Sequence, residues 1–600
     1  MINEDFGPHN YGCELLINSP SLIIGPGPVA FDVETDEKDS LVGIAVCSDP
    51  RQVFYYTSIT EPLKEMLESK QLIAQGGAFD IGIVRKCGVN ISLDQITYDT
   101  RIMCYVIDSG RKKYGLKPMA KDFLNMEWPT YKEMVKEGTL DTQPVERAAR
   151  YCGNDALATY KLYKLFSSKI TTEQTKYLNE IEMPCSIVVA KMIEKGIEID
   201  VNYLQELDLQ FKLEEEKLEK EFNQYVPPQL FDHKKKKYVM FNPRSPKQVL
   251  RLLIHNGLKV KSTGSEILEK FTKYPVVNLL LQYREINKLR STYVTALLKR
   301  GVTRVHSFFN QTGTITGRFS SSKPNVQNIP IRTDKGALIR NVFCAKDNYI
   351  LIGFDYAQVE YRLFAHSTQD ETLIKIVLDG GDVHANTASA MFNVSLDEVT
   401  KDLRRKAKTI NFGIIYGQST YGLAQQLGIS EDEATQLMDQ YWRKMPRAAS
   451  WINVQKWKAH KNKSVETLCG RSIKLPFIDK DIALTEAITN KHKYYVKYKK
   501  NLRPDFIAKL LVEGDERRAT NFPFQGGSAD ITKKAMIEVY KAGYTPILQC
   551  HDELLFEVPN TKEEIDNCIH TVKPLMENVV KLSIPLVVDH GVGKTWGGCK

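Results

Sequence analysis

Three segments of the chain carry acids and cations of the kind that nucleotidyl transfer requires, and they follow one another in a fixed order. They are GFDYAQVEYR at 353–362, RRKAKTINFGIIYG at 404–417 and LQCHDELLFEV at 548–558. Adding a nucleotide needs two metal ions held by rigid carboxylates, cations on the departing pyrophosphate, and a surface that tests the shape of the base pair. Together the segments offer a candidate for each requirement.

Two aspartates are the candidate metal ligands of this reaction. Asp355 follows the apolar run YILIGF, so we expect it at the end of a buried strand with its carboxylate exposed at a cleft. Asp552 lies with His551 and Glu553 between two apolar strands, and three consecutive polar residues there would be costly to bury without partners. We therefore expect this hairpin-like segment to place Asp552 opposite Asp355, where both can hold the same two metal ions.

A stripe of cations and aromatic rings lies between the two aspartates in sequence. Arg404, Lys408, Phe412 and Tyr416 recur every four residues, and four residues advance a helix by about 40° beyond one turn. One end of this slowly winding stripe could hold a triphosphate while the other stacks on a base. A helix with an exposed basic face and a buried aromatic face is the alternative, but it does not explain why NFGIIYG follows RRKAK in this register.

A second set of acids lies in the first third of the chain. Asp32 and Glu34 are two residues apart on a predicted strand, so both leave the same face and can share a divalent cation. Asp80 follows a short apolar strand, and Tyr151 and Asp155 lie one helical turn apart. Such pairs are common without a metal. Their order and spacing favour two-metal hydrolysis of a phosphodiester, with Tyr151 orienting the attacking water.

The surrounding patterns predict the elements that position these residues. Strand-like segments at 29–35, 41–48 and 52–57 lead into a helical one at 61–69, which predicts an α/β unit that opens with a meander. From about 171 to 298, apolar residues recur at three- and four-residue spacing, typical of long amphipathic helices. At roughly 100 to 200 residues per domain, 600 residues with 42% apolar composition predict several domains.

Charge and cysteine content limit which partners and which cellular locations fit the chain. The net charge of +9 suits a polyanionic partner only where it is clustered. The lysine-rich stretch 232–244 is predicted to be an exposed loop. The segment 491–504 interleaves tyrosine with lysine, as a surface that stacks bases and neutralises phosphates would, and a merely solvated face is the alternative.

The 11 cysteines form no CxxC pair, which argues against zinc ribbons and disulfide frameworks and favours a reducing, intracellular and cytoplasmic location. No apolar run approaches the roughly 18 residues that span a bilayer, so we expect no membrane partner.

The N-terminal acids resemble those of the DEDDy 3′ to 5′ exonucleases, the proofreading fold attached to many DNA polymerases, over about residues 25–170. Asp99 and Thr100 in YDTRIMCYVID match a pair packed near that site. The family usually has Asn four residues before Asp80, where this chain has Gly76. We expect this difference to affect binding of the terminal nucleotide rather than hydrolysis. The resemblance implies metal binding by Asp32, Glu34, Asp80 and Asp155 and a catalytic role for Tyr151.

The rest of the chain, about residues 180–600, resembles the family A DNA polymerases. TGTITGRFSSSKPNVQNIPIR (312–332) and ERRATNFPFQGGSADI (516–531) join the three segments above as ordered motifs. The resemblance implies an α+β multidomain fold. Its parts are an RNase H-like α/β exonuclease domain (1–170), connecting helices and thumb (171–305), an antiparallel palm sheet (306–365 and 536–600), and helical fingers (366–535) with a basic insertion at about 480–513.

The same resemblance assigns roles to single residues. Asp355 and Asp552 bind two Mg²⁺ ions per active site, for which Mn²⁺ can substitute, and Lys408 is catalytic. Glu360 blocks a ribose 2′-hydroxyl, and Phe412 implies poor use of dideoxynucleotides. Nucleotide-binding positions are Gln358, Glu360, His384, Arg404, Lys408, Phe412 and Tyr416. Positions that contact DNA are Arg318, Asn325, Gln327, Arg517, Asn521, Gln525 and His551.

The implied reaction is template-directed addition of dNMPs to a primer 3′-hydroxyl by a two-metal mechanism, gated by closure of the fingers, with 3′ to 5′ proofreading. Implied partners are primer–template DNA, dNTPs and replisome proteins such as a helicase-primase or single-strand binding protein. The exonuclease-like region begins within about 30 residues of Met1, so we expect no 5′ nuclease, and this compactness favours a phage-type replicative enzyme.

Three alternatives remain open at this point. A single-subunit RNA polymerase shares the palm chemistry, but Glu360 and the attached exonuclease argue against it. A repair relative without proofreading would be expected to lose exonuclease acids, and all four are present. A DNA-binding module without catalysis would need neither set of carboxylates.

Overall fold

The computed structural model describes residues 7–135, 139–226, 230–232, 237–239, 241–330, 333–498 and 501–599. Residues 233–236 and 240 of the predicted lysine-rich loop lie outside this part of the chain. The stretch differs from the prediction in one respect, because it includes a strand, β9 (Lys237–Val239), that pairs antiparallel with β8 (Leu230–Asp232). None of the helices in the described ranges has the length and apolar character needed to cross a membrane.

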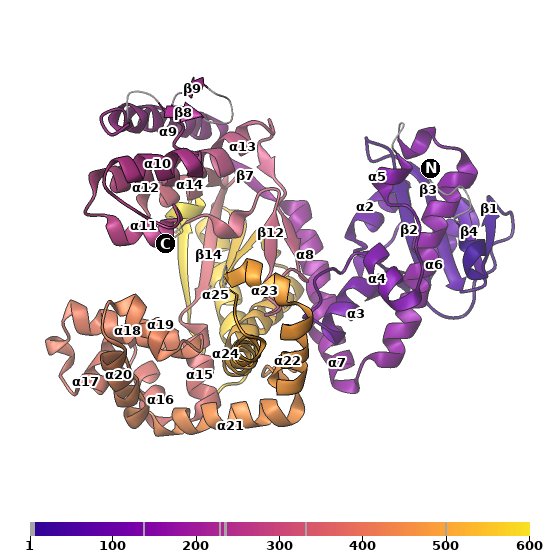
Figure 1. Ribbon diagram of the computed structural model, residues 1–600. Coiled ribbons are helices and arrows are strands. Elements are labelled where there is room, and N and C mark those ends of the chain that lie inside the picture. Colours follow the sequence, from indigo (N-terminus) through magenta and orange to yellow (C-terminus); the bar gives the residue numbers. More distant parts are fainter. Residues whose placement is uncertain are drawn as a thin grey trace.

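A six-stranded mixed sheet forms the N-terminal unit, at the right of Figure 1. Antiparallel pairing of β2, β3 and β4 confirms the predicted meander, and β1, β5 and β6 join it in parallel. β2 and helix α1 (Glu61–Ser69) begin and end at the predicted residues. In sheet order the strands are β1 (Glu14–Ile17), β4 (Gln52–Tyr56), β3 (Leu41–Asp49), β2 (Val29–Thr35), β5 (Leu72–Ala74) and β6 (Ile96–Asp99).

Both faces of this sheet are buried, and strand alternation decides which residues face which core. Val53 and Tyr55 of β4 pack in the core formed with helix α6 (Val145–Lys169), whereas Phe54 and Tyr56 pack in the core on the opposite face. In β2, Ala30 belongs to the core on the α6 side. Asp32 and Glu34 share the parity of Ala30 and therefore face α6.

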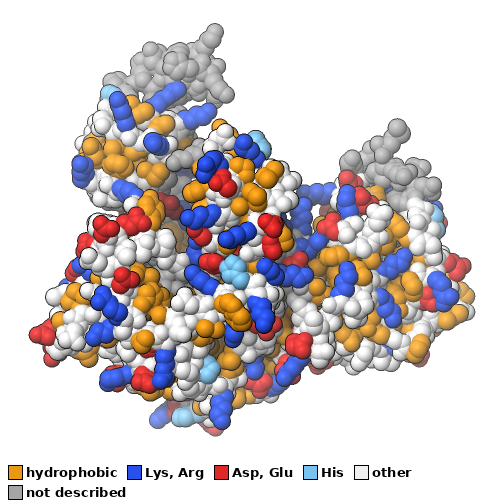
Figure 2. All heavy atoms as spheres, turned by 60° about the horizontal axis from the view of Figure 1, so that its bottom comes forward, with side chains coloured by type: hydrophobic (Ala, Val, Ile, Leu, Met, Phe, Trp, Pro, Cys, Tyr) orange, Lys and Arg blue, Asp and Glu red, His pale blue; other side chains and the backbone are white. Residues whose placement is uncertain are grey.

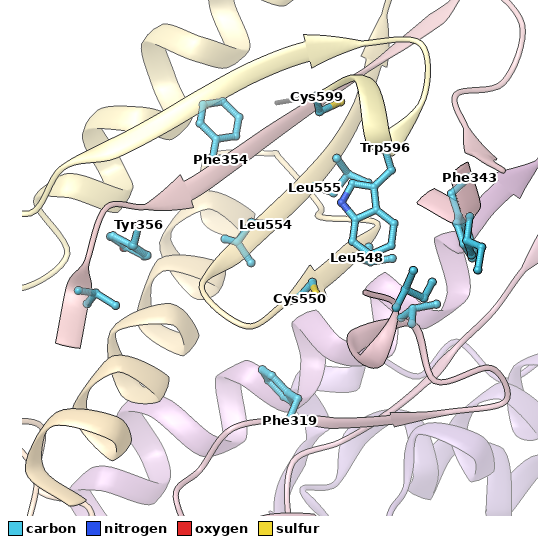
Figure 3. Packing of buried hydrophobic residues seen from close by; sticks show 14 of the residues in the cluster. Phe319, Phe343, Phe354, Tyr356, Leu548, Cys550, Leu554, Leu555, Trp596 and Cys599 are labelled. Atoms are coloured by element: carbon cyan, nitrogen blue, oxygen red, sulfur yellow. The ribbon is translucent and has the colours of Figure 1, made fainter. Parts of the chain in front are cut away.

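A four-stranded antiparallel sheet lies at the centre of the remaining chain, as predicted for the palm. In order its strands are β17 (Leu548–Cys550), β18 (Glu553–Pro559), β14 (Tyr349–Tyr356) and β19 (Val588–Gly593). Phe354 of β14 packs edge to face on Phe556 of β18, with ring centroids 5.7 Å apart. Figure 3 shows Phe354, Leu554 and Trp596 among the apolar side chains that surround these strands. The longest helix, α24 (Pro504–Lys541), packs against α8 (Met183–Lys195), α15 (Val359–Thr368) and α25 (Lys562–Glu577).

Two groups of helices lie on either side of β14 in Figure 1, one above it and one below it. The upper group contains α9 (Val201–Phe222), α10 (Pro246–His255) and α12 (Pro275–Leu289), which lie within the stretch 171–298 that was predicted to be helical. The lower group contains α16 (Glu371–Leu378), α17 (Val383–Phe392), α18 (Lys401–Ile415), α19 (Thr420–Leu427) and α20 (Glu431–Lys444).

The segment predicted as an insertion folds as α22 (Lys480–Thr489), α23 (Lys491–Tyr498) and the first turns of α24. These helices share a small core of their own that includes Ala483, Tyr494 and Ile507. Helix α21 (Pro446–Asn462) and the hairpin of β15 (Ser464–Glu466) and β16 (Ser472–Lys474) connect this segment to the lower group.

Candidate active sites

The end of β14 and the turn before β18 meet at the centre of the second sheet. Asp355 is exposed next to the last residue of β14, and its partners in strand register are Glu553 of β18 and Asp589 of β19. The backbone N–H of Tyr356 donates to the backbone oxygen of Asp552, 3.3 Å away. The turn between β17 and β18 therefore brings Asp552 to the strand end that carries Asp355.

Asp552 is held in place by a residue that the sequence patterns did not single out. Ser528 of α24 donates its hydroxyl to Oδ1 of Asp552 over 2.6 Å, and Nη2 of Arg318 lies 4.0 Å from the same oxygen. The preceding residue, His551, has φ of 57°, in the left-handed region that few residues other than glycine adopt. Such a backbone persists only where its surroundings impose it.

A cleft of about 350 Å³ opens beside Asp552. Its walls come from α15, α17, α18 and the β17–β18 turn, which are far apart in sequence. Eight of the residues predicted from the sequence line it: Arg318, Gln358, Glu360, His384, Phe412, Tyr416, His551 and Asp552.

One wall of the cleft carries a carboxylate that interacts with an arginine and a tyrosine. Glu360, in the first turn of α15, accepts a hydrogen bond from Arg318 and interacts with the Tyr416 hydroxyl. Burial raises the pKa of Glu360, and the Arg318 guanidinium opposes that shift. Tyr416 and Phe412 are stacked, with ring centroids 6.2 Å apart and planes 6° from parallel. The cleft thus combines a fixed acid with a flat aromatic surface.

The predicted cation stripe belongs to α18, which begins after Thr400 and ends at Ile415. Tyr416 lies just beyond the last residue of the helix rather than within it. Arg404 forms an ion pair with Asp382, the residue that caps α17. The basic end of α18 is therefore fixed to α17.

His384 of α17 contacts two residues of α18. Its ring is 5.4 Å from that of Phe412, and its Nδ1 is 3.2 Å from Nδ2 of the buried Asn411. Burial lowers the pKa of His384, and Lys408 and Arg404 lower it further. The Asp382 carboxylate opposes this shift. A neutral imidazole offers one donor and one acceptor nitrogen.

Five predicted DNA-contacting residues lie outside this cleft. Nε2 of Gln327 donates to Oε1 of Gln549 over 2.7 Å, and Oδ1 of Asn325 accepts from Ser321 over 3.1 Å. The other three share one face of α24, at successive turns of the helix that reaches Asp552 through Ser528. They are Arg517, Asn521 and Gln525.

The N-terminal acids form a second site, between β2 and α6. Ligand atoms of Asp32, Glu34 and Cys152 lie within 4.8 Å of one another. In the part of the chain that the structure describes, this is the group of side chains close enough to hold a metal ion together. Burial raises the pKa of Asp32 and of Glu34 well above the usual range, and repulsion from Asp155 raises both further. Carboxylates that repel one another in a buried setting are suited to a divalent cation. Cys152 was not expected there.

Asp80 and Asp155 flank this close group. Burial, with repulsion from Asp99, raises the pKa of Asp80 to about 7. Oδ1 of Asp155 accepts a hydrogen bond from Nε1 of Trp128 over 2.7 Å, and Nζ of Lys117 lies 3.6 Å from it. All four predicted acids thus lie in one electrostatic neighbourhood, although only Asp32 and Glu34 belong to the 4.8 Å group.

Tyr151 is paired with a cation that the sequence patterns did not reveal. Lys117 at the start of α4 (Leu116–Leu124) donates to the Tyr151 hydroxyl over 2.6 Å, and its ammonium lies 4.0 Å from the ring centroid. Tyr151 itself is 4% exposed. Lys117 stands in the stretch YGLKPMA, where a lysine in the first turn of a helix carries no spacing signal. Only the fold brings it to the acids.

Gly76 occupies a left-handed backbone position with φ of 83°. Its N–H donates to Oδ2 of Asp99 over 2.7 Å, and a Cβ there would have only Nη1 of Arg101 nearby, at 3.4 Å. Space for a side chain therefore exists, at the cost of an unfavourable φ. Asp99 and Thr100 pack against this turn, since Thr100 donates to the backbone oxygen of Ala74 over 3.2 Å.

These two sites lie in regions that match two known families. The sequence profile of DNA polymerase family A matches residues 201–598, and that of a 3′-5′ exonuclease matches residues 10–171. The chain belongs to DNA polymerase family A. It contains an exonuclease α/β domain followed by a largely helical polymerase domain.

Bacterial DNA polymerase I sequences are similar to this chain along most of its length. The Pseudomonas aeruginosa protein is 32% identical over 95% of the chain, and the Bacillus subtilis protein is 33% identical over 96% of it. The chain spans 63% and 64% of the length of those two proteins. A solved structure, the POL domain of Pol1 from M. smegmatis in complex with DNA primer–template and dNTP, aligns with a TM-score of 0.79 at 28% identity and covers 96% of both chains.

Proposed function

We propose that the protein is a DNA-directed DNA polymerase with a 3′ to 5′ proofreading exonuclease. The observation that carries the proposal is the cleft at the end of β14, where Asp552, Glu360, His384 and Tyr416 converge from four separate elements. The Mycobacterium structure similar to this chain contains primer–template and dNTP, which supports the same use of the cleft here.

Residues that line the cleft, and two cations earlier on α18, would hold different parts of the nucleotide. Lys408 and Arg404 on α18, with His384 on α17, would bind the triphosphate. Phe412 and Tyr416 would stack on the nascent base pair. Glu360, fixed by Arg318, would fill the space that a ribose 2′-hydroxyl needs and so select deoxynucleotides. We propose that the remaining predicted residues of α24 and of the 312–332 motif contact primer and template.

Divalent metal ions, Mg²⁺ or Mn²⁺ in its place, would be held by Asp355 and Asp552 in the polymerase site and by Asp32, Glu34, Asp80 and Asp155 in the exonuclease site. The donors fit, since both sets consist of carboxylate oxygens, which hard cations prefer. When bound, the ions activate the attacking oxygen and neutralise the leaving group. Ser528 would fix the orientation of Asp552, and Lys117 would fix the hydroxyl of Tyr151, which orients the attacking water.

Primer extension on a longer template, with and without dNTPs, tests the proposal. The protein and its Asp355→Ala and Asp32→Ala variants are compared in Mg²⁺. We expect Asp355→Ala to abolish extension alone and Asp32→Ala to abolish primer shortening alone. Asp347→Ala, an exposed acid just before β14, is the matched control and should change neither. Extension that survives in Asp355→Ala would contradict the assignment, and efficient use of ribonucleotides would favour the RNA polymerase alternative.

The finer assignments stay predictions. The relatives compared above are bacterial DNA polymerase I proteins and lend no support to a phage-type replicative role. Helicase-primase and single-strand binding partners likewise stay predictions. We propose the domain division 1–170, 171–305, 306–365, 366–535 and 536–600.

A further inference from the structure

Helix α21 has an unusual composition for a surface helix. Its 17 residues include no aspartate or glutamate. Its basic residues are Arg447, Lys456, Lys458, His460 and Lys461. Lys456 and His460 share one carboxylate, that of Glu516 on α24, at 3.5 and 2.9 Å. Among the described residues, no carboxylate pairs with Lys458 or Lys461. The outer face of α21 is therefore a patch of positive charge.

A large aromatic side chain stands in the middle of this patch. Trp457 is 61% exposed, and Val454, one turn earlier, is 46% exposed. Nζ of Lys461, one turn later, lies 5.3 Å from the Trp457 ring. Figure 2 turns the lower side of Figure 1, where α21 lies, toward the viewer, and basic and hydrophobic side chains are interspersed over this surface. An exposed tryptophan between lysines combines a stacking surface with neutralisation of phosphates.

The patch continues a cavity that adjoins the polymerase cleft. This cavity, of about 400 Å³, is lined by Gly417 and Arg517 and, on α21, by Asn453 and Lys456. Gly417 directly follows Tyr416, which lines the polymerase cleft. Trp457 lies one turn beyond Asn453 on the same helix face, and Lys461 lies one turn further. From Asn453 to Lys461 the helix advances about 12 Å. Tyr416 at the cleft, Gly417 and Arg517 at the cavity, and Trp457 one turn along α21 from the cavity wall thus follow one another in this order.

We propose that the unpaired template strand lies along α21 before it enters the cleft, with a base stacked on Trp457 and phosphates beside Lys458 and Lys461. The inference rests on the proposed polymerase function. A single strand fits better than a duplex because duplex bases are already stacked on one another and present no free face to an aromatic side chain. The positive charge matches the phosphate backbone, and this series of residues starts where a templating base would be read.

Binding to primer–templates that differ only in overhang length tests the proposal. Dissociation constants are measured by fluorescence anisotropy in EDTA, which prevents hydrolysis, for 5′ template overhangs of two and of ten nucleotides. We expect the long overhang to bind the unmodified protein about tenfold more tightly, as one stacked base provides. Trp457→Ala should lose this gain while its affinity for the short overhang stays the same.

The lysines are tested by salt dependence. For the long overhang, Lys458→Ala/Lys461→Ala should reduce the slope of log Kd against log salt by about 1.4, since each phosphate contact on a single strand contributes about 0.7. Lys176→Ala, an exposed lysine on α7 (Thr172–Tyr177) in the N-terminal unit, is the matched control and should leave the slope unchanged.

Two results would overturn the proposal. One is an equal gain from the long overhang in the unmodified protein and in Trp457→Ala. The other is an equal loss of affinity for both overhangs, because that would assign Trp457 to duplex binding or to folding. Extension of the primer on the two-nucleotide overhang is run alongside. If the unmodified protein fails to extend it, the proposed function fails; if it extends normally and overhang length does not matter, only the inference about α21 fails.

Discussion

At the scale of single residues, the ammonium group of Lys117 contacts two predicted residues of the exonuclease site. It donates to Tyr151 and lies 3.6 Å from Asp155. Partners that orient metal ligands typically contribute about 10- to 100-fold to activity. We therefore expect Lys117→Met to slow primer shortening by about that factor and to leave extension unchanged, measured on labelled primers with and without dNTPs. Lys121→Met on the same helix is the control, and equal shortening by both variants would contradict the role.

Gly76 is the second residue whose effect can be measured. We expect Gly76→Asn to lower the KM for primer shortening and to leave kcat unchanged, because a Cβ at this position would have only the Arg101 guanidinium nearby. The left-handed φ should lower stability by about 1 kcal/mol. Gly76→Ala adds a Cβ without the amide, and although alanine tolerates a left-handed φ less well than asparagine, the comparison of KM between the two folded variants isolates the contribution of the amide. A KM that falls equally in both would refute this explanation.

At the scale of elements, helix α24 couples the packing of the polymerase domain to its chemistry. The hydroxyl of Ser528 holds Asp552 at 2.6 Å, so Ser528→Ala should lower kcat for extension by about 10- to 100-fold with little change in the KM for dNTP. Thr532→Ala, one turn further along α24, is the control, because among the described residues its hydroxyl bonds to the backbone oxygen of Ser528 and not to Asp552. A raised KM with unchanged kcat would place Ser528 in nucleotide binding instead.

Local sequence patterns predict elements well and contacts between distant elements poorly. Strand β2 and helix α1 were predicted residue for residue because their periodicity is local, and Asp355 was expected at an exposed strand end for the same reason. Ser528 and Lys117 were missed because each acts on a residue far along the chain, Asp552 and Tyr151, and no local spacing encodes such a contact. Cys152 entered the acid cluster only because β2 packs on α6.

At the scale of the whole molecule, a buried ionic network joins the N-terminal unit to the polymerase domain. Arg471, between β15 and β16, is 3% exposed and binds Glu182 and Asp530, both fully buried. It also donates to the hydroxyls of Tyr105 on α3 (Thr100–Ile107) and Tyr177 on α7. Removing one partner of such a network leaves an uncompensated buried charge, which costs about 3–5 kcal/mol. The network therefore links the N-terminal unit to the polymerase domain through buried charged groups.

The pH dependence of stability follows from Glu182. Burial alone would raise its pKa, but Lys533 and Arg471 outweigh burial and lower the pKa to about 2. A carboxyl whose pKa is lower in the folded state stabilises the fold above its unfolded pKa of about 4.5, and this contribution is lost as the pH falls toward 2. We expect the midpoint temperature of unfolding, measured by calorimetry from pH 7 to pH 3, to fall less steeply with acid in Glu182→Gln than in the unmodified protein, from a lower starting value. If the midpoint temperature falls equally steeply in the two proteins, Glu182 has the same pKa in the folded and unfolded states. The network would then not make the junction between the two units sensitive to acid.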